Sequence, residues 1–535
     1  MTSIEFLRSQ PKLSSLLGAW EKCVGENPDG AFIHVAQITA TRVQKYTYAT
    51  FFKRAQRHAL AYQAVLKLVP GDKIAVCVND LSDFALIVHG ALLTGCVVIP
   101  VNSKATPKEL AEILKAGAPK AFIFPPSQSA AIATLLSKAP SVKHWIVTGQ
   151  NQDGAGASRT GENSVIRRLE AVLLSVAGEE FKPPQVEGAP PSGVVFSPNG
   201  KFVSASNALF LSQEQILKKA WLSAKVIEQC EPTGSLWMSE SEFTPEGFLF
   251  HFFMSLFHPG AVLVRPGFDE REFWAQALAD DIQLAVLNNS QLEILERKGK
   301  PRGWRKPDPF SVLITDEVRL DEKVLKSFSE RFFTPCGVAF FSSRLAEYVS
   351  LRRPGVTDLK SIRGESGEIL PSFGTLLGNA KVEESALSGL RSDSRYTWGK
   401  LFLKSLFADD YFDAGIRAAI VDVDGRDELY IVGRVKELIV RKGKLINLEL
   451  VNTLVAQLKG VVYGRAVAFP HDQFGQDFSV YVIPHRLAQM NRYDVELFLA
   501  EHLSREEMPS SITLEDQTGA EPPKTEQELR ARVGM

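Results

Sequence analysis

The sequence has 535 residues, of which 45% are apolar and 23% are charged, and these proportions exclude a disordered, collagen-like or fibrous chain. At about 150 residues per domain, this length predicts roughly three or four core-forming units. The 61 Lys and Arg residues nearly balance the 62 Asp and Glu residues, which gives a formal net charge of -1. Because no basic field attracts polyanions, we expect a globular protein that does not bind nucleic acid.

Cysteine usage and the apolar segments predict where the protein resides. The five cysteines are scattered without any CxxC pair, which argues against a disulfide framework or a structural zinc site and favours a reducing compartment. The first 20 residues lack the basic and apolar segments of a secretory signal. The longest apolar segment, residues 84–101, is interrupted by His89, Gly90 and Pro100 and is too broken for a membrane span of about 20 residues. We predict a buried helix and a buried strand there, and a cytoplasmic protein.

Residues 49–124 alternate between helical and strand patterns. Apolar residues recur at helical spacing in residues 49–68, 83–95 and 107–117. Short runs rich in β-branched residues occupy residues 73–79, 96–102 and 120–124. Strands that alternate with helices predict right-handed crossovers and a mainly parallel sheet covered by helices. The predicted fold class is therefore α/β.

Further strands and a change of pattern follow. Strand patterns at residues 261–266, 282–289 and 310–316 would extend the same sheet or build a second one. Near residue 433 the pattern becomes strand, turn, strand and amphipathic helix, which is typical of a small α+β domain. We therefore expect a large domain of residues 1–433, with two α/β subdomains and a further β-rich part, and a small C-terminal lid-like domain of residues 434–535. The polar tail from Asp516 should be mobile unless something docks it.

Three segments carry a resemblance to a known family. The segment TYATFFKRAQRHALAYQAVLKLVPGDKIAVCVND (47–80), with GCVVIPVN (95–102) after it, resembles the adenylate-forming superfamily of acyl-CoA synthetases, fatty acyl-AMP ligases and adenylation domains. The segment GESGEILPSFG (364–374) is similar to that family's glycine–proline turn. The longest likeness is LYIVGRVKELIVRKGKLI (429–446), which is similar to the hinge between the family's two domains.

The resemblance implies a chemistry and a set of parts. Members join a carboxylic acid to ATP, release pyrophosphate, and pass the acyl group to a thiol or another acceptor. That reaction needs a phosphate cradle, magnesium, an adenosine site, and a lysine that neutralises the charge between carboxylate and α-phosphate. The resemblance also implies that the two domains rotate about Lys436–Glu437 between two working conformations.

The phosphate cradle of the family is a Ser/Thr/Gly-rich loop. Alignment of the flanking strand and helix places SPNGK at this position, so Ser197, Asn199, Gly200 and Lys201 are the candidate phosphate contacts. The loop is shorter than the family's by about half a dozen residues, which leaves few N–H groups to wrap a triphosphate. A Pro-Asn-Gly turn between two strands is the alternative interpretation.

The adenine and magnesium positions of the family align with residues 336–340. Gly337 and Ala339 keep small residues of that motif, whereas Cys336 stands at the aromatic position and Phe340 at the magnesium-binding carboxylate. A phenylalanine offers no oxygen to a hard cation, so we predict no metal site. Cys336 could be catalytic, but no partner can be named, and a small buried residue explains it better.

The remaining family positions are weaker matches. The expected active-site histidine is missing between Ser239 and Phe243, and His251 on an apolar helix suits a core residue better than a ligand. Asp413 is the candidate for the ribose-binding carboxylate, although the order of Asp and Gly is reversed there. Asp422, Asp424 and Gly425 predict a hairpin turn.

Two basic residues complete the candidate set. Arg434 aligns with an arginine that contacts ribose or phosphate in the family, although it could equally serve the domain interface. Lys524 is the candidate catalytic lysine, with Pro523 where the family has glycine, and a solvated lysine on an exposed tail is the alternative.

Three functions remain open from the sequence. The first is a catalytically degenerate homologue that keeps the fold to bind an acyl or aryl carboxylate, an acyl-carrier protein or another partner. The second is an active acyl-AMP or acyl-CoA ligase that uses ATP and magnesium at a reshaped site, with Lys201, Arg434 and Lys524 supplying positive charge. The third is acyl transfer without ATP, for which no nucleophile can be named. We favour the first, because several groups that the chemistry needs are replaced.

Overall fold

A computed structural model describes most of the chain, and all structural statements concern the described residues. These residues are 15–36, 43–149, 166–184, 192–196, 208–232, 234–239, 243–265, 267–316, 320, 322–355, 360–365, 367–387, 390, 395–407, 410–515, 522–523 and 525–534. The chain divides into two compact units, each described by itself. The first comprises Met1–Thr315, Val324–Val349 and Arg353–Val356, and the second comprises Asp316–Lys323, Ser350–Arg352 and Thr357–Met535.

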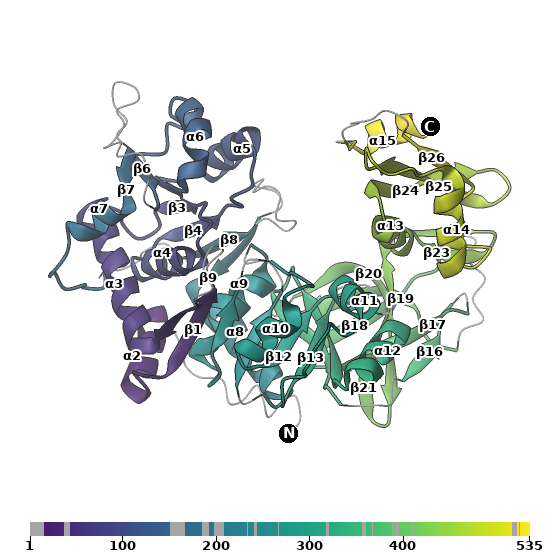
Figure 1. The fold of residues 1–535 in the computed structure, drawn as a ribbon, viewed down its shortest axis with the longest axis horizontal. Helices are drawn as coiled ribbons and strands as arrows, with labels where there is room; N and C mark the ends of the chain where they lie inside the picture. Colours follow the sequence, from purple (N-terminus) through teal and green to yellow (C-terminus); the bar gives the residue numbers. More distant parts are fainter. Residues whose placement is uncertain are drawn as a thin grey trace. The chain divides into compact units, whose positions relative to one another are not determined.

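The first unit is built from alternating strands and helices (Figure 1). Its strands are β1 (Ala31–Ala36), β2 (Val43–Thr47), β3 (Lys73–Val76), β4 (Val97–Pro100), β5 (Ala121–Phe124), β6 (His144–Val147), β7 (Ile166–Arg168), β8 (Gly193–Phe196), β9 (Leu209–Ser212), β10 (Ser235–Met238), β11 (Val262–Val264), β12 (Ile282–Leu287), β13 (Ser311–Thr315) and β14 (Cys336–Ser342). Its helices are α2 (Leu16–Glu26), α3 (Tyr48–Ala64), α4 (Leu81–Leu93), α5 (Pro107–Gly117), α6 (Ser129–Leu135), α7 (Leu169–Leu174), α8 (Gln213–Glu228), α9 (Pro245–Phe252), α10 (Phe273–Ala279) and α11 (Asn289–Lys298). Two further elements run across the division, α12 (Glu322–Phe332) and β15 (Glu347–Arg352).

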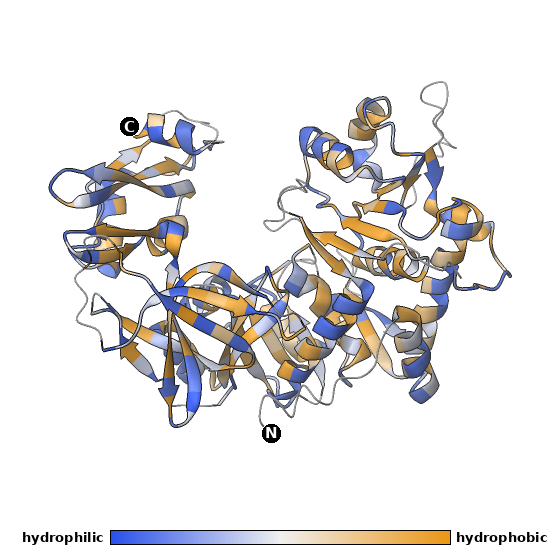
Figure 2. Ribbon diagram, turned by 180° about the vertical axis from the view of Figure 1, so that it is seen from behind, coloured by the Kyte–Doolittle hydropathy of each residue, from blue (hydrophilic) through white to orange (hydrophobic). Residues whose placement is uncertain are grey.

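A seven-stranded sheet lies in the first unit, in the order β7-β6-β5-β3-β4-β8-β9. All neighbours are parallel except β8 and β9, so the predicted mainly parallel α/β sheet is confirmed. Its strands are largely hydrophobic (Figure 2), because helices cover them. Phe122, Phe124 and Trp145 on the strands pack with Leu110 of α5 and Ile132 of α6 in one buried cluster.

Local sequence signals explain where these helices begin and end. The α5 helix starts at Pro107 behind a capping box in which Thr106 and Glu109 bond reciprocally to each other's backbone N–H. It ends before Ala118, which adopts the left-handed conformation. Asp80 caps α4 by accepting hydrogen bonds from two backbone N–H groups. The predicted buried helix and strand over residues 84–101 are therefore confirmed as α4 and β4.

A second set of strands in the first unit is also mainly parallel. The strand order is β2-β1-β11-β10-β12-β13-β14, and only β2 runs antiparallel to its neighbour. The alternative that residues 261–316 build a second sheet is thus the correct one. Because parallel strands end at the same edge, the residues after β10, β12, β13 and β14 lie along one edge of this sheet.

The second unit contains two antiparallel groups of strands. The first group has the order β18-β19-β20-β21-β17, with β16 paired to β17. The second has the order β23-β22-β25-β24, with β26 beside β25. The elements are β16 (Ser361–Arg363), β17 (Ile369–Leu376), β18 (Asn379–Glu384), β19 (Gly399–Lys404), β20 (Tyr411–Val423), β21 (Arg426–Arg434), η3 (Val435–Glu437), β22 (Leu438–Arg441), β23 (Lys444–Asn447), α13 (Leu448–Gln457), β24 (Val461–His471), β25 (Gly475–Pro484), α14 (Arg492–His502), β26 (Ser511–Leu514) and α15 (Glu526–Arg532).

The lid-like part of the second unit has its own core. Val451, Val455, Phe478, Val480 and Leu499 pack together between α13, β25 and α14. The predicted strand, turn, strand and helix after residue 429 are confirmed as β21, η3, β22, β23 and α13. The predicted domain boundary at residues 433/434 falls inside this unit and stays a prediction.

Two sequence predictions concern membranes and the tail. Among the described helices, none combines the length and the apolar character that a membrane crossing requires. The end of the tail is docked: residues Glu526–Arg532 form α15, and buried Leu529 packs with Val467, Tyr481 and Ile483.

Candidate functional site

The adenine and magnesium positions predicted from the sequence lie on β14. Gly337 pairs with Leu313 and Ala339 with Thr315 of the parallel neighbour β13, and every residue of β14 is buried. Ala339 is 0% exposed and Phe340 is 1% exposed. The strand therefore brings both small candidate residues into the sheet centre, where glycine and alanine leave room for neighbouring atoms.

Phe340 occupies the place that the resemblance assigns to a magnesium-binding carboxylate. Its ring is buried and carries no oxygen, whereas magnesium requires near-octahedral oxygen ligands. Within the described parts of the chain, no group of three or more His, Cys, Asp or Glu side chains could hold a metal ion. The residues at this position therefore do not fit magnesium.

Cys336 begins β14 and is buried. Its Sγ donates to the carbonyl oxygen of Thr334 at 3.4 Å. A thiol that is buried and bonded to a backbone carbonyl suits a small core residue better than a nucleophile, which needs access and a lowered pKa.

The candidate phosphate contacts lie outside the described residues. Ser197, Asn199, Gly200 and Lys201 belong to the connection between β8 and β9. These two strands pair antiparallel, with Phe196 opposite Leu209. The strand before this connection and the helix after it, β8 and α8, are present as expected. The alignment and the cradle itself stay predictions.

Asp413, the candidate ribose ligand, lies half-buried on β20. Its Oδ1 accepts a hydrogen bond from the backbone N–H of Gly415 at 2.7 Å, and its Oδ2 lies 3.7 Å from the Lys400 ammonium. Since Ile416 pairs with Arg434 of β21, the structure brings Asp413 and Arg434 to the same end of this strand pair. The carboxylate already has partners there.

The predicted hairpin turn is confirmed. Asp424 and Gly425 join β20 to β21 with φ angles of 54° and 76°, and Asp422 Oδ1 accepts from the Gly425 N–H at 3.0 Å. Such a two-residue turn with positive φ angles matches the twist of the flanking strands. The Lys360 ammonium hydrogen-bonds Asp424 and holds the pKa of that exposed carboxyl below its usual range.

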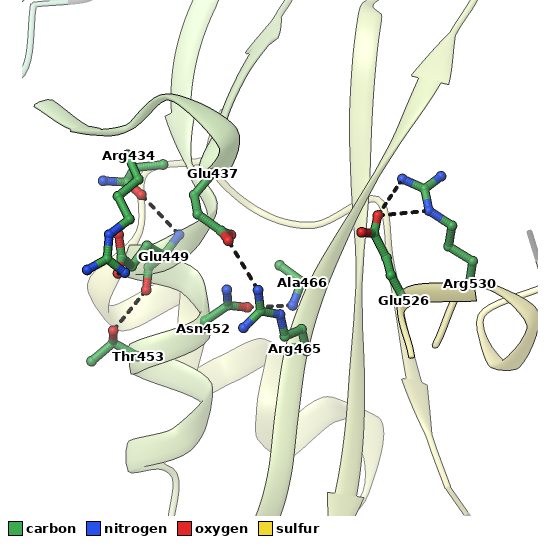
Figure 3. A network of polar contacts seen from close by, with 10 residues as sticks. Arg434, Glu437, Glu449, Asn452, Thr453, Arg465, Ala466, Glu526 and Arg530 are labelled. Atoms are coloured by element: carbon green, nitrogen blue, oxygen red, sulfur yellow. Dashed lines mark hydrogen bonds and ion pairs between the residues drawn. The ribbon is translucent and has the colours of Figure 1, made fainter. Parts of the chain in front are cut away.

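Arg434 lies at the end of β21 and faces the lid-like part. Its Nη1 donates to Glu449 Oε1 at 3.2 Å, and the two side chains are 36% and 25% exposed (Figure 3). Glu449 belongs to the first turn of α13, where a negative charge also complements the helix dipole. Arg434 is therefore bonded within the junction between β21 and α13, and its role toward a ribose or phosphate stays a prediction.

The junction is tied by further polar contacts. Asn447 Nδ2 donates to the Val432 carbonyl at 3.0 Å, and its Oδ1 accepts from the Glu449 N–H at 3.0 Å. Glu437 accepts from Arg465 of β24 at 3.1 Å (Figure 3). Gly433, with φ 155°, lies so close that an added Cβ would stand 2.6 Å from Asn447 Nδ2. We call the set Gly433, Arg434, Glu437, Asn447, Glu449 and Arg465 the hinge network.

Lys524 lies outside the described residues, but the helix after it is held firmly. Thr525 caps α15 by accepting from the Glu528 N–H at 3.1 Å. Arg532 donates to Tyr481 Oη at 3.0 Å, and Tyr481 Oη donates to Glu515 at 2.5 Å. Arg530 bonds to Glu526 on the same helix (Figure 3).

Several buried polar groups could not be predicted from the sequence, which shows only a polar residue within an apolar run at each position. Lys219 of α8 pairs with Glu347 of β15 at 2.5 Å, and both side chains are almost fully buried. Arg417 of β20 forms a two-pronged pair with Glu365 at 2.6 and 2.7 Å. Asn289, at the start of α11, is 1% exposed, and neither amide atom has a hydrogen-bond partner. The ion pairs join residues far apart in sequence, so only the fold brings them together.

The family model for AMP-binding enzymes matches residues 20–191, which cover α2 to the connection before β8. About a third of the chain, in its N-terminal part, is therefore similar in sequence to AMP-binding enzymes. A benzoate–CoA ligase of Thauera aromatica is 31% identical over 137 residues, which cover 26% of this chain and 23% of that protein. A probable CoA ligase of Humulus lupulus, CCL9, is 22% identical over 521 residues, which cover 94% of this chain and 93% of that protein.

Solved structures with a similar fold match along the whole chain. The anthranilate CoA ligase AuaEII in complex with anthranoyl-AMP gives a TM-score of 0.68 at 12% identity, with 100% of this chain and 99% of that chain covered. ATP-bound MatB from Rhodopseudomonas palustris gives a TM-score of 0.63 at 17% identity, again with 100% of this chain and 99% of that chain covered. The curated matches at higher identity are short, since this chain spans about a quarter of the length of the first two.

Proposed function

We propose that this chain is a catalytically degenerate adenylate-forming protein that binds an acyl or aryl carboxylate without activating it with ATP. The observation that carries the proposal is Phe340, whose buried ring stands where the superfamily's magnesium ligand is expected. Without that carboxylate, magnesium lacks a ligand at this position. The negative charge of the ATP phosphates would then lack the cation that balances it during the reaction.

The chemistry explains why this position matters. Acid activation requires that a carboxylate oxygen attack the α-phosphorus while the bond to pyrophosphate breaks, so two anionic groups must meet. Cations and preorganised donors make this approach possible, and each can be worth about 3–4 kcal/mol in the transition state. Arg434, one of the cations named from the sequence, is already paired with Glu449.

Binding of a carboxylate does not need those groups. By the resemblance, segments around residues 237–257 and 282–291 would line an inherited acyl site. In β10 and β12 the side chains of Leu236, Met238, Leu284 and Leu287 are all buried. An apolar site favours an acyl chain or an aryl ring over a charged ligand. We infer that the site was kept for such a ligand after the nucleotide chemistry was lost.

The test is calorimetric titration of the purified protein with ATP and magnesium, then with AMP, and then with a nonhydrolysable acyl-adenylate analogue. We expect no heat of binding from ATP and no carboxylate-dependent ATP–pyrophosphate exchange. Specific ATP binding together with exchange above the rate of a heat-inactivated sample would overturn the proposal. Circular dichroism of the same sample shows that the protein titrated is folded.

An active acyl-AMP or acyl-CoA ligase is the second candidate. It is favoured by the similarity to a probable CoA ligase along 94% of the chain. In that case ATP and magnesium would be required, and Lys524 would supply the cation near the α-phosphate. Lys524→Ala should then abolish adenylate formation, whereas Lys459→Ala, at an exposed lysine in the turn before β24, should leave it unchanged. If exchange occurs and Lys524→Ala does not reduce it, the role of Lys524 is wrong.

A further inference from the structure

Asn289 lies at the edge of a parallel sheet where its strands end. The residue begins α11, with one residue between it and the end of β12, and β12 is parallel to both β10 and β13. In open parallel sheets with covering helices, the carboxyl edge is where ligands bind. By the resemblance, residues 282–291 would also line an inherited acyl site.

The Asn289 side chain is buried, and no group in the described part of the chain forms a hydrogen bond with it. Only 1% of the residue is exposed, and both Nδ2 and Oδ1 lack a hydrogen-bond partner. A side-chain amide can donate two hydrogen bonds and accept two, and burial without them is unfavourable. Most buried polar side chains in native proteins have at least one partner, so this one needs an explanation.

The polar neighbours in the sequence do not supply the missing bonds, because they bond to one another. Asn288 Oδ1 accepts from the Gln291 N–H at 3.0 Å, and Gln291 Oε1 accepts from the Asn288 N–H at 3.0 Å. The Ser239 hydroxyl, directly after β10, contacts Gln291 Oε1 and lies 3.2 Å from the Val286 carbonyl. Asn289 is thus the polar side chain of this group that stays unpaired.

The surroundings limit what could pair with it. Val286, Leu287 and Leu292, which are near Asn289 in sequence, are apolar and at most 1% exposed, and so is Leu313, which lies opposite Val286 on β13. A ligand that fits here is mostly apolar and carries one group that exchanges hydrogen bonds with a primary amide, such as a hydroxyl, an amino group or a carbonyl.

We propose that Asn289 determines specificity in the acyl site, and that the ligand is an apolar or aryl carboxylic acid with one hydrogen-bonding substituent remote from its carboxylate. This inference rests on the proposed function, which names the carboxylate class, and adds the substituent and the residue that recognises it. A site built to hydrogen-bond a substituent rejects the isosteric analogue that lacks it, because its own polar group is then left unpaired.

The experiment compares wild-type protein with Asn289→Leu, which has a similar volume and no polar atoms. The probes are benzoic acids with a methyl or a hydroxyl group at the ortho, meta or para position, and hexanoic acid with 6-hydroxyhexanoic acid. Wild-type protein should bind at least one hydroxylated acid about tenfold more tightly than its unhydroxylated or methyl counterpart. Asn289→Leu should remove or invert that preference.

The unfolding temperature of the unliganded proteins is the second measurement. If Asn289 had a structural role, Asn289→Leu would lower this temperature. Because no bond is lost, Asn289→Leu should unfold at the same temperature as wild type or higher. Asn452→Leu is the matched control, since Asn452 Oδ1 accepts from the Ala466 N–H at 2.6 Å and its loss should lower the unfolding temperature.

The outcomes separate this inference from the proposed function. Carboxylic acids that bind both proteins with the same hydroxyl preference would overturn the role of Asn289 and leave the proposed function standing. A clear fall in the unfolding temperature of Asn289→Leu would also overturn it, because the amide would then have an internal partner. If no acid binds the wild type, the proposed function fails and this inference fails with it.

Discussion

Two regions that the resemblance singles out, β14 and the hinge network, differ in how their side chains are used. On β14 the backbone and the small residues Gly337 and Ala339 are kept, but an apolar ring stands where a carboxylate is expected. In the hinge network, polar residues make contacts from β21 to α13 and β24.

The difference separates what a fold needs from what a reaction needs. A strand in the middle of a parallel sheet requires only buried residues of suitable size, so a carboxylate can become a phenylalanine without loss of the strand. The hinge network holds its geometry through specific hydrogen bonds and a glycine with φ 155°, so its residues cannot be exchanged as freely.

The largest effect is expected from placing a carboxylate at residue 340 of β14. Phe340→Glu should lose about 3–5 kcal/mol of unfolding free energy, because it buries an unpaired charge, and it should not gain ATP–pyrophosphate exchange. Phe340→Leu, the apolar control, should lose less than about 1.5 kcal/mol. Urea unfolding and the exchange assay measure both. A stable Phe340→Glu protein with magnesium-dependent exchange would show that the rest of the nucleotide site is intact.

In the hinge network, a single added carbon atom at Gly433 should strain the structure. Gly433→Ala should lose about 2 kcal/mol, because φ 155° is unfavourable for alanine and the new Cβ would meet Asn447. In a double-mutant cycle with Asn447→Ala, part of that loss should be recovered, since the closest clash is removed, while the backbone strain and the approach to Leu438 remain. Strictly additive losses in urea unfolding would show that Asn447 does not cause the strain.

Unfolding free energies of these variants have to be compared near neutral pH. At lower pH, buried histidines in the first unit should reduce the stability of the folded protein. Burial lowers the pKa of His58 to about 4 and that of His89 to about 3, against 6.5 for a free imidazole. As pH falls below 6.5, the unfolded chain takes up protons that the folded one does not, so stability falls. Each histidine should cost about 1.4 kcal/mol by pH 5.5. The slope of unfolding free energy against pH should be shallower in His58→Gln, and an unchanged slope would contradict the assignment.

The smallest effect is expected from the ion pair of the hinge network. Arg434→Ala should lose about 0.5–1 kcal/mol, because both partners are partly exposed and a surface ion pair contributes little. Glu449→Gln should give a similar loss, and the double variant should lose less than the sum of the two. A loss of ATP binding in Arg434→Ala, after ATP binding in the wild type, would instead assign Arg434 to a nucleotide site.

Much of the fold could be predicted from the sequence, because local signals mark its elements. The α5 helix has the predicted bounds, since a capping box and Pro107 start it and Gly117 with Ala118 ends it. The strands of the first sheet are one to three residues shorter than their apolar runs, because pairing with neighbours decides where a strand ends.

The candidate site could be predicted only in part. Residues 336–340 and Arg434 were located because apolar runs and glycines around them align with a family pattern. The partners of Arg434 and the isolation of Asn289 could not be predicted, because both depend on which side chains the fold brings together. The pairing of Lys219 with Glu347, 128 residues apart, is another contact of this kind.

The docking of α15 has a practical consequence for handling the protein. Leu529 is buried against Tyr481 and Ile483, and Arg532 is bonded to Tyr481, only a few residues before Met535. A chain shortened to end at residue 515 would expose this apolar surface and leave Glu515 without the nearby Arg532. Expression trials that shorten this end should therefore yield less well-behaved protein, and an affinity tag is better attached beyond Met535 through a flexible spacer.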